Sequence, residues 1–176
     1  MERMMSSWRR INALDLALCL QCNRVSRYAL LCFFFRIVSR LGNGVFWYSL
    51  MSVMLLVDGM QAVPTVIRMV LAGLACLAIY KYLKTTTSRP RPYQVYVAIS
   101  AAAPALDRFS FPSGHTLHAV CFTTLACSAY PQLTPVLWPF TLLIAASRPI
   151  LGLHYPSDVL AGALIGLGVA QLAIGF

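Results

Sequence analysis

Most of this chain consists of long apolar stretches that are separated by short polar breaks. After residue 44, the apolar stretches lie at about 45–60, 66–83, 113–130, 136–150 and 156–176. They approach the length of roughly 20 residues that a helix needs to cross a bilayer. Pro64 and Pro156 stand at the start of two of them, where proline fits the first helical turn. The pattern predicts an all-α fold, a polytopic membrane helical bundle with about five spans.

Residues 1–43 follow a different pattern, in which arginines alternate with short apolar stretches. No stretch there is long enough to cross a bilayer, so we expect an amphipathic segment that lies at the membrane interface. A Gly-Asn-Gly sequence at 42–44 ends this pattern and divides the chain into this segment, 1–43, and a membrane domain, 44–176. A sixth span would have to lie between Ile11 and Arg40, where each buried arginine costs roughly 2.5–3.5 kcal/mol near the bilayer centre.

Composition supports a membrane protein, because 59% of the residues are hydrophobic and 11% are charged, against about 25% charged in soluble domains. The mean hydropathy of +0.72 agrees. The net charge of +9 is concentrated before Asn43 and between Lys81 and Arg108. In so apolar a chain this charge argues against nucleic acid and leaves two interpretations: a positive-inside topology signal, and phosphate binding by the second cluster. Cys19 and Cys22 lack the further ligands that a zinc site needs.

Two polar loops are expected on one face of the membrane. Residues 84–112 join the second and third predicted spans, and residues 151–156 join the fourth and fifth. The spans between these loops cross the membrane and return, so the polar side chains of both loops can meet. The N-terminal segment falls on the same face, and its arginines place that face in the cytoplasm. A sixth span near the N-terminus would place the loops outside instead.

One polar group, at the start of the third span, is Pro112-Ser113-Gly114-His115. Ser113 is expected to cap the helix, and the free backbone N–H groups of the first turn then favour an anion. Gly114 allows a ligand to approach the backbone closely, and His115 lies beside any anion bound there. A plain capped helix with an interfacial histidine is the alternative interpretation.

A second polar group joins Ser147-Arg148 to His154 and Asp158. Charged groups at membrane depth are costly and are usually functional. The offset of four between His154 and Asp158 lets the carboxylate bind one imidazole nitrogen and leave the other free to attack a substrate. A structural salt bridge between Arg148 and Asp158 is the alternative, although it leaves His154 unexplained.

A third polar group, from Lys84 to Arg91-Pro92, supplies cations on a chain that is stiffened by prolines. Arginine suits bidentate contacts with phosphate. Taken alone, this group also fits a solvated basic cluster next to the membrane. Together, the three groups hold what phosphoryl transfer requires, namely cations for the phosphate oxygens, a nucleophile and an acid for the leaving oxygen.

In residue types, order and spacing, these groups resemble the signature of the type 2 phosphatidic acid phosphatase superfamily, and the resemblance covers residues 84–158. The resemblance implies that the phosphate is bound by Lys84, Arg91, Ser113, Gly114 and Arg148. It implies a catalytic set in which His154 attacks phosphorus, His115 protonates the leaving oxygen and Asp158 orients His154. No metal and no cofactor are expected. Arg89 and His118 match no signature position.

The resemblance implies a hydrolase that acts on a lipid phosphate or pyrophosphate through a phosphohistidine. Undecaprenyl pyrophosphate, phosphatidic acid and related prenyl or glycerolipid phosphates all stay open as substrates. Its expected partners are that substrate and membrane lipids, with no nucleic acid, in a multi-pass protein of the bacterial cytoplasmic (inner) membrane. The alternatives are a non-enzymatic or transport protein that retains the fold, and a vanadate-dependent haloperoxidase. Haloperoxidases are soluble, so the hydropathy argues against the second alternative.

Overall fold

The computed structural model describes the backbone of residues 2–175 and the side chains of residues 12–175, and the described chain is helical with connecting loops. The longer helices are α1 (Glu2–Asn23), α2 (Ala29–Leu41), α3 (Val45–Asp58), α4 (Val63–Thr87), α6 (Gly114–Ala129), α7 (Thr134–Ile150) and α8 (Pro156–Ile174). Short helical turns join them: η1 (Arg24–Arg27), η2 (Gly59–Gln61), α5 (Pro92–Val95) and η3 (Pro131–Leu133). The five predicted spans therefore correspond to α3, α4, α6, α7 and α8, except that Phe176 lies outside the described residues.

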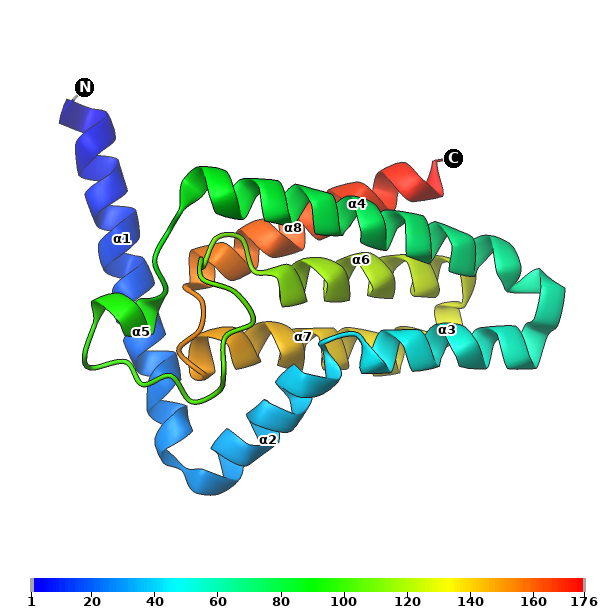
Figure 1. The fold of residues 1–176 in the computed structure, drawn as a ribbon, viewed down its shortest axis with the longest axis horizontal. Coiled ribbons are helices and arrows are strands. Elements are labelled where there is room, and N and C mark those ends of the chain that lie inside the picture. Colours follow the sequence, from blue (N-terminus) through cyan, green and yellow to red (C-terminus); the bar gives the residue numbers. More distant parts are fainter. Residues whose placement is uncertain (1, 176) are drawn as a thin grey trace.

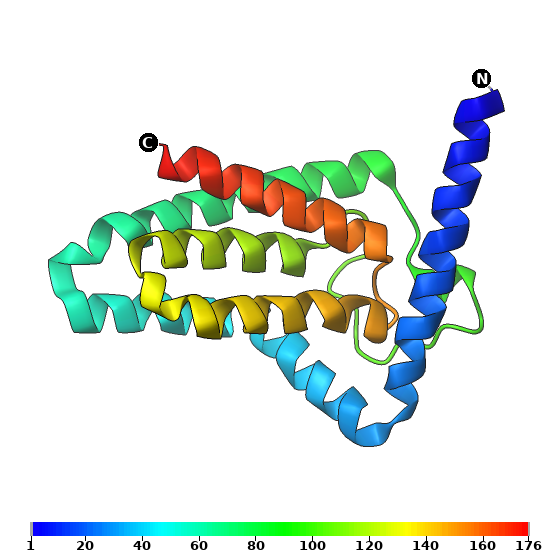
Figure 2. The ribbon, with the colours of Figure 1, turned by 180° about the vertical axis from the view of Figure 1, so that it is seen from behind.

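Helix α6 occupies the centre of the bundle and packs against α4, α7 and α8 (Figures 1 and 2). Most of its side chains are buried, and its polar Thr123 pairs with Thr141 of α7, with 2.6 Å between the hydroxyl oxygens. Buried hydroxyls that satisfy one another avoid the cost of an unpaired polar group in an apolar interior. The predicted site residues at the start of α6 are thus carried by a largely buried helix.

Two glycines of α8 allow its close approach to α6. A Cβ atom at Gly162 would lie 2.6 Å from the backbone oxygen of Ser113, and one at Gly166 would lie 2.2 Å from that of Leu117. Any larger residue would push the helices apart, so this spacing of small residues sets their separation. Close helix packing of this kind is typical of a Gly-x-x-x-Gly sequence, and it places the starts of both helices side by side.

By length and apolar composition, α7 with η3, α8, and α4 with its extension to Val95 are candidate membrane spans. Helices α2 and α3 together form one further candidate, bent by 52° at residues 42–44. The described residues thus support three to four spans, and the count of about five stays a prediction. Helix α6 has 16 residues and is shorter than a typical span, but it is enclosed by its neighbours.

The N-terminal helices cover the end of the bundle that carries the polar loops. Helix α1 crosses this end beside α5 and the loop 96–113, and α2 packs on α7 (Figures 1 and 2). Asn23 fixes α1 there, because its amide nitrogen donates to the backbone oxygens of Ser100 (3.1 Å) and Ile150 (3.0 Å). The N-terminal segment, which the sequence predicts on the face of the polar loops, therefore contacts the first of these loops and the end of α7 that leads into the second.

Candidate active site

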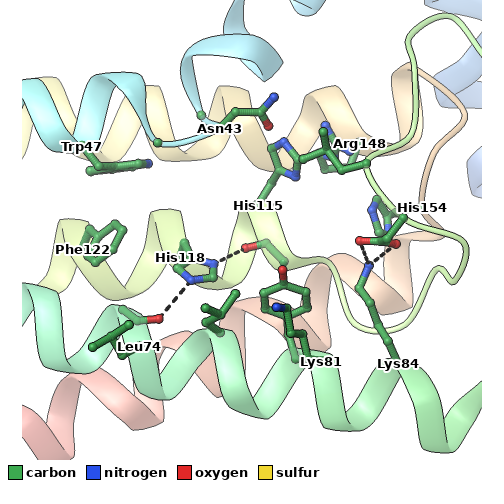
Figure 3. A pocket seen from close by; sticks show the side chains of 18 of the residues that line it. Asn43, Trp47, Leu74, Lys81, Lys84, His115, His118, Phe122, Arg148 and His154 are labelled. Atoms are coloured by element: carbon green, nitrogen blue, oxygen red, sulfur yellow. Dashed lines mark hydrogen bonds and ion pairs between the residues drawn. The ribbon is translucent and has the colours of Figure 1, made fainter.

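A cavity of about 640 Å³ lies between α3, α4, α6 and the polar loops (Figure 3). At the loop end, its wall carries the charged and polar side chains of Lys84, Arg91, Asp107, His115, Arg148 and His154. Deeper in the bundle, the wall is apolar and includes Trp47, Met51, Val70, Leu74, Leu77 and Phe122. The cavity therefore joins a charged compartment to an apolar one, which suits a ligand with an anionic head and a hydrocarbon tail.

His154 is buried in the loop between α7 and α8, and both of its ring nitrogens have defined neighbours. Its Nδ1 lies 2.6 Å from the backbone oxygen of Ser110, and its Nε2 lies 3.2 Å from Nη1 of Arg91. A carbonyl oxygen can only accept, so Nδ1 carries the proton and Nε2 presents a lone pair toward the cavity. Burial, followed by the charges of Arg148, Arg91 and Lys84, lowers the pKa of His154 well below its usual value, which keeps Nε2 available.

Asp158 is fully buried in the first turn of α8. Its Oδ2 accepts a hydrogen bond from the backbone N–H of Tyr155 (2.9 Å), which caps the helix, and another from the hydroxyl of Ser110 (2.7 Å). The distance from Oδ2 to His154 Nδ1 is 3.8 Å, too long for a hydrogen bond. Asp158 therefore connects to His154 through Ser110. The Ser110 hydroxyl donates to Asp158, and the Ser110 backbone carbonyl accepts from His154.

The salt bridge between Arg148 and Asp158, raised as an alternative from the sequence, is not formed. Asp158 pairs with Arg89 instead, with 2.6 Å between Oδ1 and Nη1. Arg148 is buried at the end of α7, and its Nη1 donates to the hydroxyl of Ser39 on α2. Its Nε has no partner among the residues that the structure describes. A buried guanidinium with an unused donor beside the cavity is suited to an anionic ligand.

Lys84 and Arg91 converge on one carboxylate, that of Asp107. Nζ of Lys84 lies 2.7 Å from both Asp107 oxygens, and Nη2 of Arg91 lies 2.7 Å from Oδ1. Burial raises the pKa of Asp107, but the hydrogen bonds and charges of Lys84 and Arg91 outweigh that effect and hold the pKa below its usual value. Asp107 thus occupies the position between these two cations where an anionic oxygen of a ligand would bind.

The backbone around each cation explains why it points into the cavity. Lys84 lies in the last turn of α4, which ends at Ser88 in the left-handed conformation with φ 47°. Pro90 and Pro92 restrict the following chain, and Arg91 precedes the short α5 in an extended conformation. The last turn of α4 and the proline-stiffened chain after it therefore bring both cations to the same side of the cavity.

Ser113 caps α6, as predicted, because its hydroxyl oxygen accepts from the backbone N–H of Thr116 (3.5 Å). Its backbone N–H donates to the backbone oxygen of Asp158 (3.0 Å), which ties the start of α6 to the start of α8. His115, one residue beyond Gly114, lines the cavity and makes no side-chain hydrogen bond with any described residue. Its ring is therefore available to a ligand in the charged compartment.

The structure brings the eight predicted site residues to one end of the bundle. The expectation that both loops share a face places Lys84, Arg91 and His154 there, and the other five lie at the helix ends next to these loops. The sequence did not reveal Asp107, Ser110, Arg89 or Asp15, which all bond to members of the set. Asp15 and Asp107 are two of the five acids in the chain, and that scarcity was the available signal.

Proteins that are similar to this chain include phosphatases of prenyl-linked lipids. Decaprenylphosphoryl-5-phosphoribose phosphatase of Mycobacterium tuberculosis is 34% identical over 97 residues, which cover 54% of this chain and 51% of that protein. Undecaprenyl-diphosphatase BcrC of Bacillus subtilis is 29% identical over 106 residues, which cover 60% of this chain and 54% of that protein. The chain thus spans about half the length of the curated relatives that it matches.

Solved structures share the fold over nearly the whole chain. A transmembrane PAP2 type phosphatidylglycerolphosphate phosphatase from Bacillus subtilis superposes with a TM-score of 0.78 at 24% identity, covering 95% of this chain and 86% of that one. Aquifex aeolicus LpxE superposes with a TM-score of 0.76 at 25% identity, covering 93% and 96%. The sequence model of the PAP2 superfamily matches residues 65–176, which are more than half of the chain and contain all three polar groups, so the chain belongs to the PAP2 superfamily.

Proposed function

We propose that this protein is a membrane phosphatase that hydrolyses a lipid phosphate or diphosphate through a phosphohistidine at His154. The observation that carries the proposal is the arrangement of the His154 ring. Its Nδ1 is held by the Ser110 carbonyl at 2.6 Å, and its Nε2 faces the cavity beside Arg91. A neutral imidazole with a fixed tautomer and an unprotonated Nε2 at the cavity wall is a prepared nucleophile.

In the proposed first step, Nε2 of His154 forms a bond to phosphorus as the bond from phosphorus to the leaving oxygen breaks. Lys84, Arg91 and Arg148 stabilise the charge on the phosphoryl oxygens. His115, in its protonated form, donates a proton to the leaving oxygen, and the resulting neutral ring takes a proton from the water that then attacks the phosphohistidine. Inorganic phosphate is released and His154 returns to its neutral form. These roles rest on the family resemblance and on the positions of the side chains around one cavity.

The proposed substrate class is a prenyl phosphate or diphosphate, and undecaprenyl pyrophosphate is one member. The apolar compartment beyond the cations would receive the hydrocarbon chain, and the names of the similar M. tuberculosis and B. subtilis proteins support the prenyl class. Glycerolipid phosphates such as phosphatidic acid are the alternative class. Release of phosphate by the purified protein from a panel of prenyl and glycerolipid phosphates tests both the phosphatase activity and the substrate class. We expect release with at least one prenyl lipid and none from His154→Ala; a lack of release from every lipid would contradict the proposal.

The proposed location is the bacterial cytoplasmic membrane, with the active site and α1 on the cytoplasmic side. Val97 is fully exposed in the loop that faces the site, so a cysteine there reports on sidedness. In a cysteine-free background, we expect Val97→Cys to resist an impermeant thiol reagent in intact cells and to react after lysis. Labelling in intact cells would place the site outside.

A further inference from the structure

Arg89 lies outside the family signature, yet it makes the only lysine or arginine contact to Asp158 among the described residues. Its Nη1 donates to Asp158 Oδ1 (2.6 Å) and to the hydroxyl of Ser157 (2.8 Å). Its guanidinium also lies over the ring of Tyr155, 4.1 Å from the centroid. Arg89 is therefore held against the first turn of α8 by charge, hydrogen bonds and stacking at once.

The other edge of the same guanidinium binds helix α1. Nη2 of Arg89 lies 2.7 Å from Oδ2 of Asp15, which is 4% exposed. Asp15 also accepts hydrogen bonds from Ser157, from its backbone N–H to Oδ1 (2.9 Å) and from its hydroxyl to Oδ2. Asp15 thus supplies from a different helix the acceptor that the start of α8 would otherwise lack.

The charges explain why this bridge matters to the site. Asp158 is fully buried, and a buried carboxylate without a cation is strongly disfavoured. Lys84 and Arg91 are paired with Asp107, and Arg148 bonds to Ser39. Arg89 is therefore the cation that pairs with Asp158 and aligns it, and Asp158 in turn accepts a hydrogen bond from the Ser110 hydroxyl at 2.7 Å. Through Ser110, this alignment reaches the His154 ring.

We propose that Arg89 and Asp15 are positioning residues of the active site, and that α1 supports catalysis by holding Asp158 in place through Arg89. Neither residue lines the cavity, so neither contacts the substrate. The inference rests on the proposed phosphatase activity, and it gives the N-terminal segment a role in that activity. It predicts a loss in the chemical step without a loss in phosphate binding.

The kinetic test compares Arg89→Gln, Arg89→Lys and Asp15→Asn with Arg108→Gln, which removes an exposed arginine of the same loop region that makes no ion pair with a described residue. We expect Arg89→Gln to lower kcat roughly tenfold, as loss of a supporting partner of a catalytic group does. KM and inhibition by vanadate should change less than twofold, because the phosphate-binding cations are untouched. Arg89→Lys keeps a charge near Asp158 and should recover part of kcat, and Arg108→Gln should match the wild type.

Asp15→Asn should lower kcat less than Arg89→Gln, and it should add little in the Arg89→Gln background because both act through one bridge. A wild-type kcat in Arg89→Gln would overturn the proposal. So would a rise in KM and a weakening of vanadate inhibition as large as the fall in kcat. If Arg89→Gln fails to fold, a wild-type kcat in Asp15→Asn would overturn the proposal instead. Lack of hydrolysis by the wild type would instead reject the proposed function.

A second measurement does not depend on hydrolysis. Cys19 lies one turn after Asp15 on α1, is fully buried, and its Sγ is 3.9 Å from the backbone oxygen of His154. If the Arg89–Asp15 bridge holds α1 in place, Arg89→Gln should raise the rate at which Cys19 reacts with a maleimide at least severalfold, read at peptide level by mass spectrometry. Cys76, buried between α4 and α6, serves as the internal control and should not change. An unchanged Cys19 rate would overturn the docking role of the bridge.

Discussion

The Nδ1 atom of His154 lies 2.6 Å from the backbone oxygen of Ser110, so the ring of the proposed nucleophile is oriented by a main-chain carbonyl. Asp158 lies 3.8 Å from the same nitrogen and bonds to the Ser110 hydroxyl. The direct carboxylate–imidazole contact expected from the offset of four residues is therefore replaced by a contact through Ser110. The first prediction follows from this difference.

Asp158→Asn should be less damaging than loss of His154 itself, because the carbonyl of Ser110 still fixes the tautomer. We expect kcat to fall roughly 100-fold in Asp158→Asn, at the upper end of the range for supporting partners, and turnover to be abolished in His154→Ala. Ser110→Ala retains the carbonyl and should lose less than Asp158→Asn. Phosphate release by the purified variants measures all three. An Asp158→Asn protein as inactive as His154→Ala would contradict the geometry.

The pH dependence of the free enzyme reports the lowered pKa of His154. Burial and the cations Arg148, Arg91 and Lys84 lower this pKa, so the neutral nucleophile persists at more acidic pH than an ordinary histidine allows. The acid limb of kcat/KM should therefore lie below about 6.5, the usual histidine value. Removing a cation in Arg91→Gln should move that limb to higher pH, and Arg108→Gln should leave it in place. A wild-type acid limb above the usual value, or a shift to lower pH in Arg91→Gln, would contradict this assignment.

Asp107 should compete with phosphate for Lys84 and Arg91, because its carboxylate lies 2.7 Å from the cationic nitrogens of both. Asp107→Asn keeps the shape and removes the charge. We expect inhibition by vanadate or inorganic phosphate to tighten roughly two- to fivefold, since a partly exposed ion pair is worth no more than about 1 kcal/mol. Asp58→Asn is the matched control, because Asp58 is the last residue of α3 and does not line the cavity. Weaker inhibition in Asp107→Asn would show that Asp107 instead holds the two cations in position.

Activity should not depend on a divalent metal. The proposed roles assign phosphate binding to Lys84, Arg91 and Arg148, and a magnesium site would need carboxylates that share a ligand sphere with the phosphate. We expect the rate of phosphate release to survive dialysis against EDTA, and vanadate to inhibit. Loss of activity with the chelator and its recovery on addition of magnesium would refute this prediction.

Hydropathy and proline positions were sufficient to predict the helices that form the bundle, because each is set by a local pattern. The meeting of Lys84, His115 and His154 followed from the parity of the spans. The number of spans did not follow, since α6 is short and α2 and α3 are joined at a bend of 52°.

The contacts that support the site residues could not be predicted from local sequence patterns. The carbonyl of Ser110 is a backbone group that every residue carries, so nothing in the sequence marks it. The bridge from Arg89 to Asp15 joins residues 74 positions apart and exists only because α1 docks across the bundle end. The alternative raised from the sequence paired Asp158 with Arg148, whereas the structure pairs it with Arg89, which reaches it from the other polar loop.

The most direct test of the central claim is to trap the phosphorylated enzyme. His115→Ala should still form the intermediate from a substrate with a good leaving group, such as p-nitrophenyl phosphate, but should hydrolyse it slowly because the water lacks its base. When the phosphoryl group of the substrate is radiolabelled, the account predicts a label on His154 that is stable in alkali and lost in acid. The double variant His115→Ala/His154→Ala should carry no label. A label on another residue, or wild-type turnover in His154→Ala, would contradict the account.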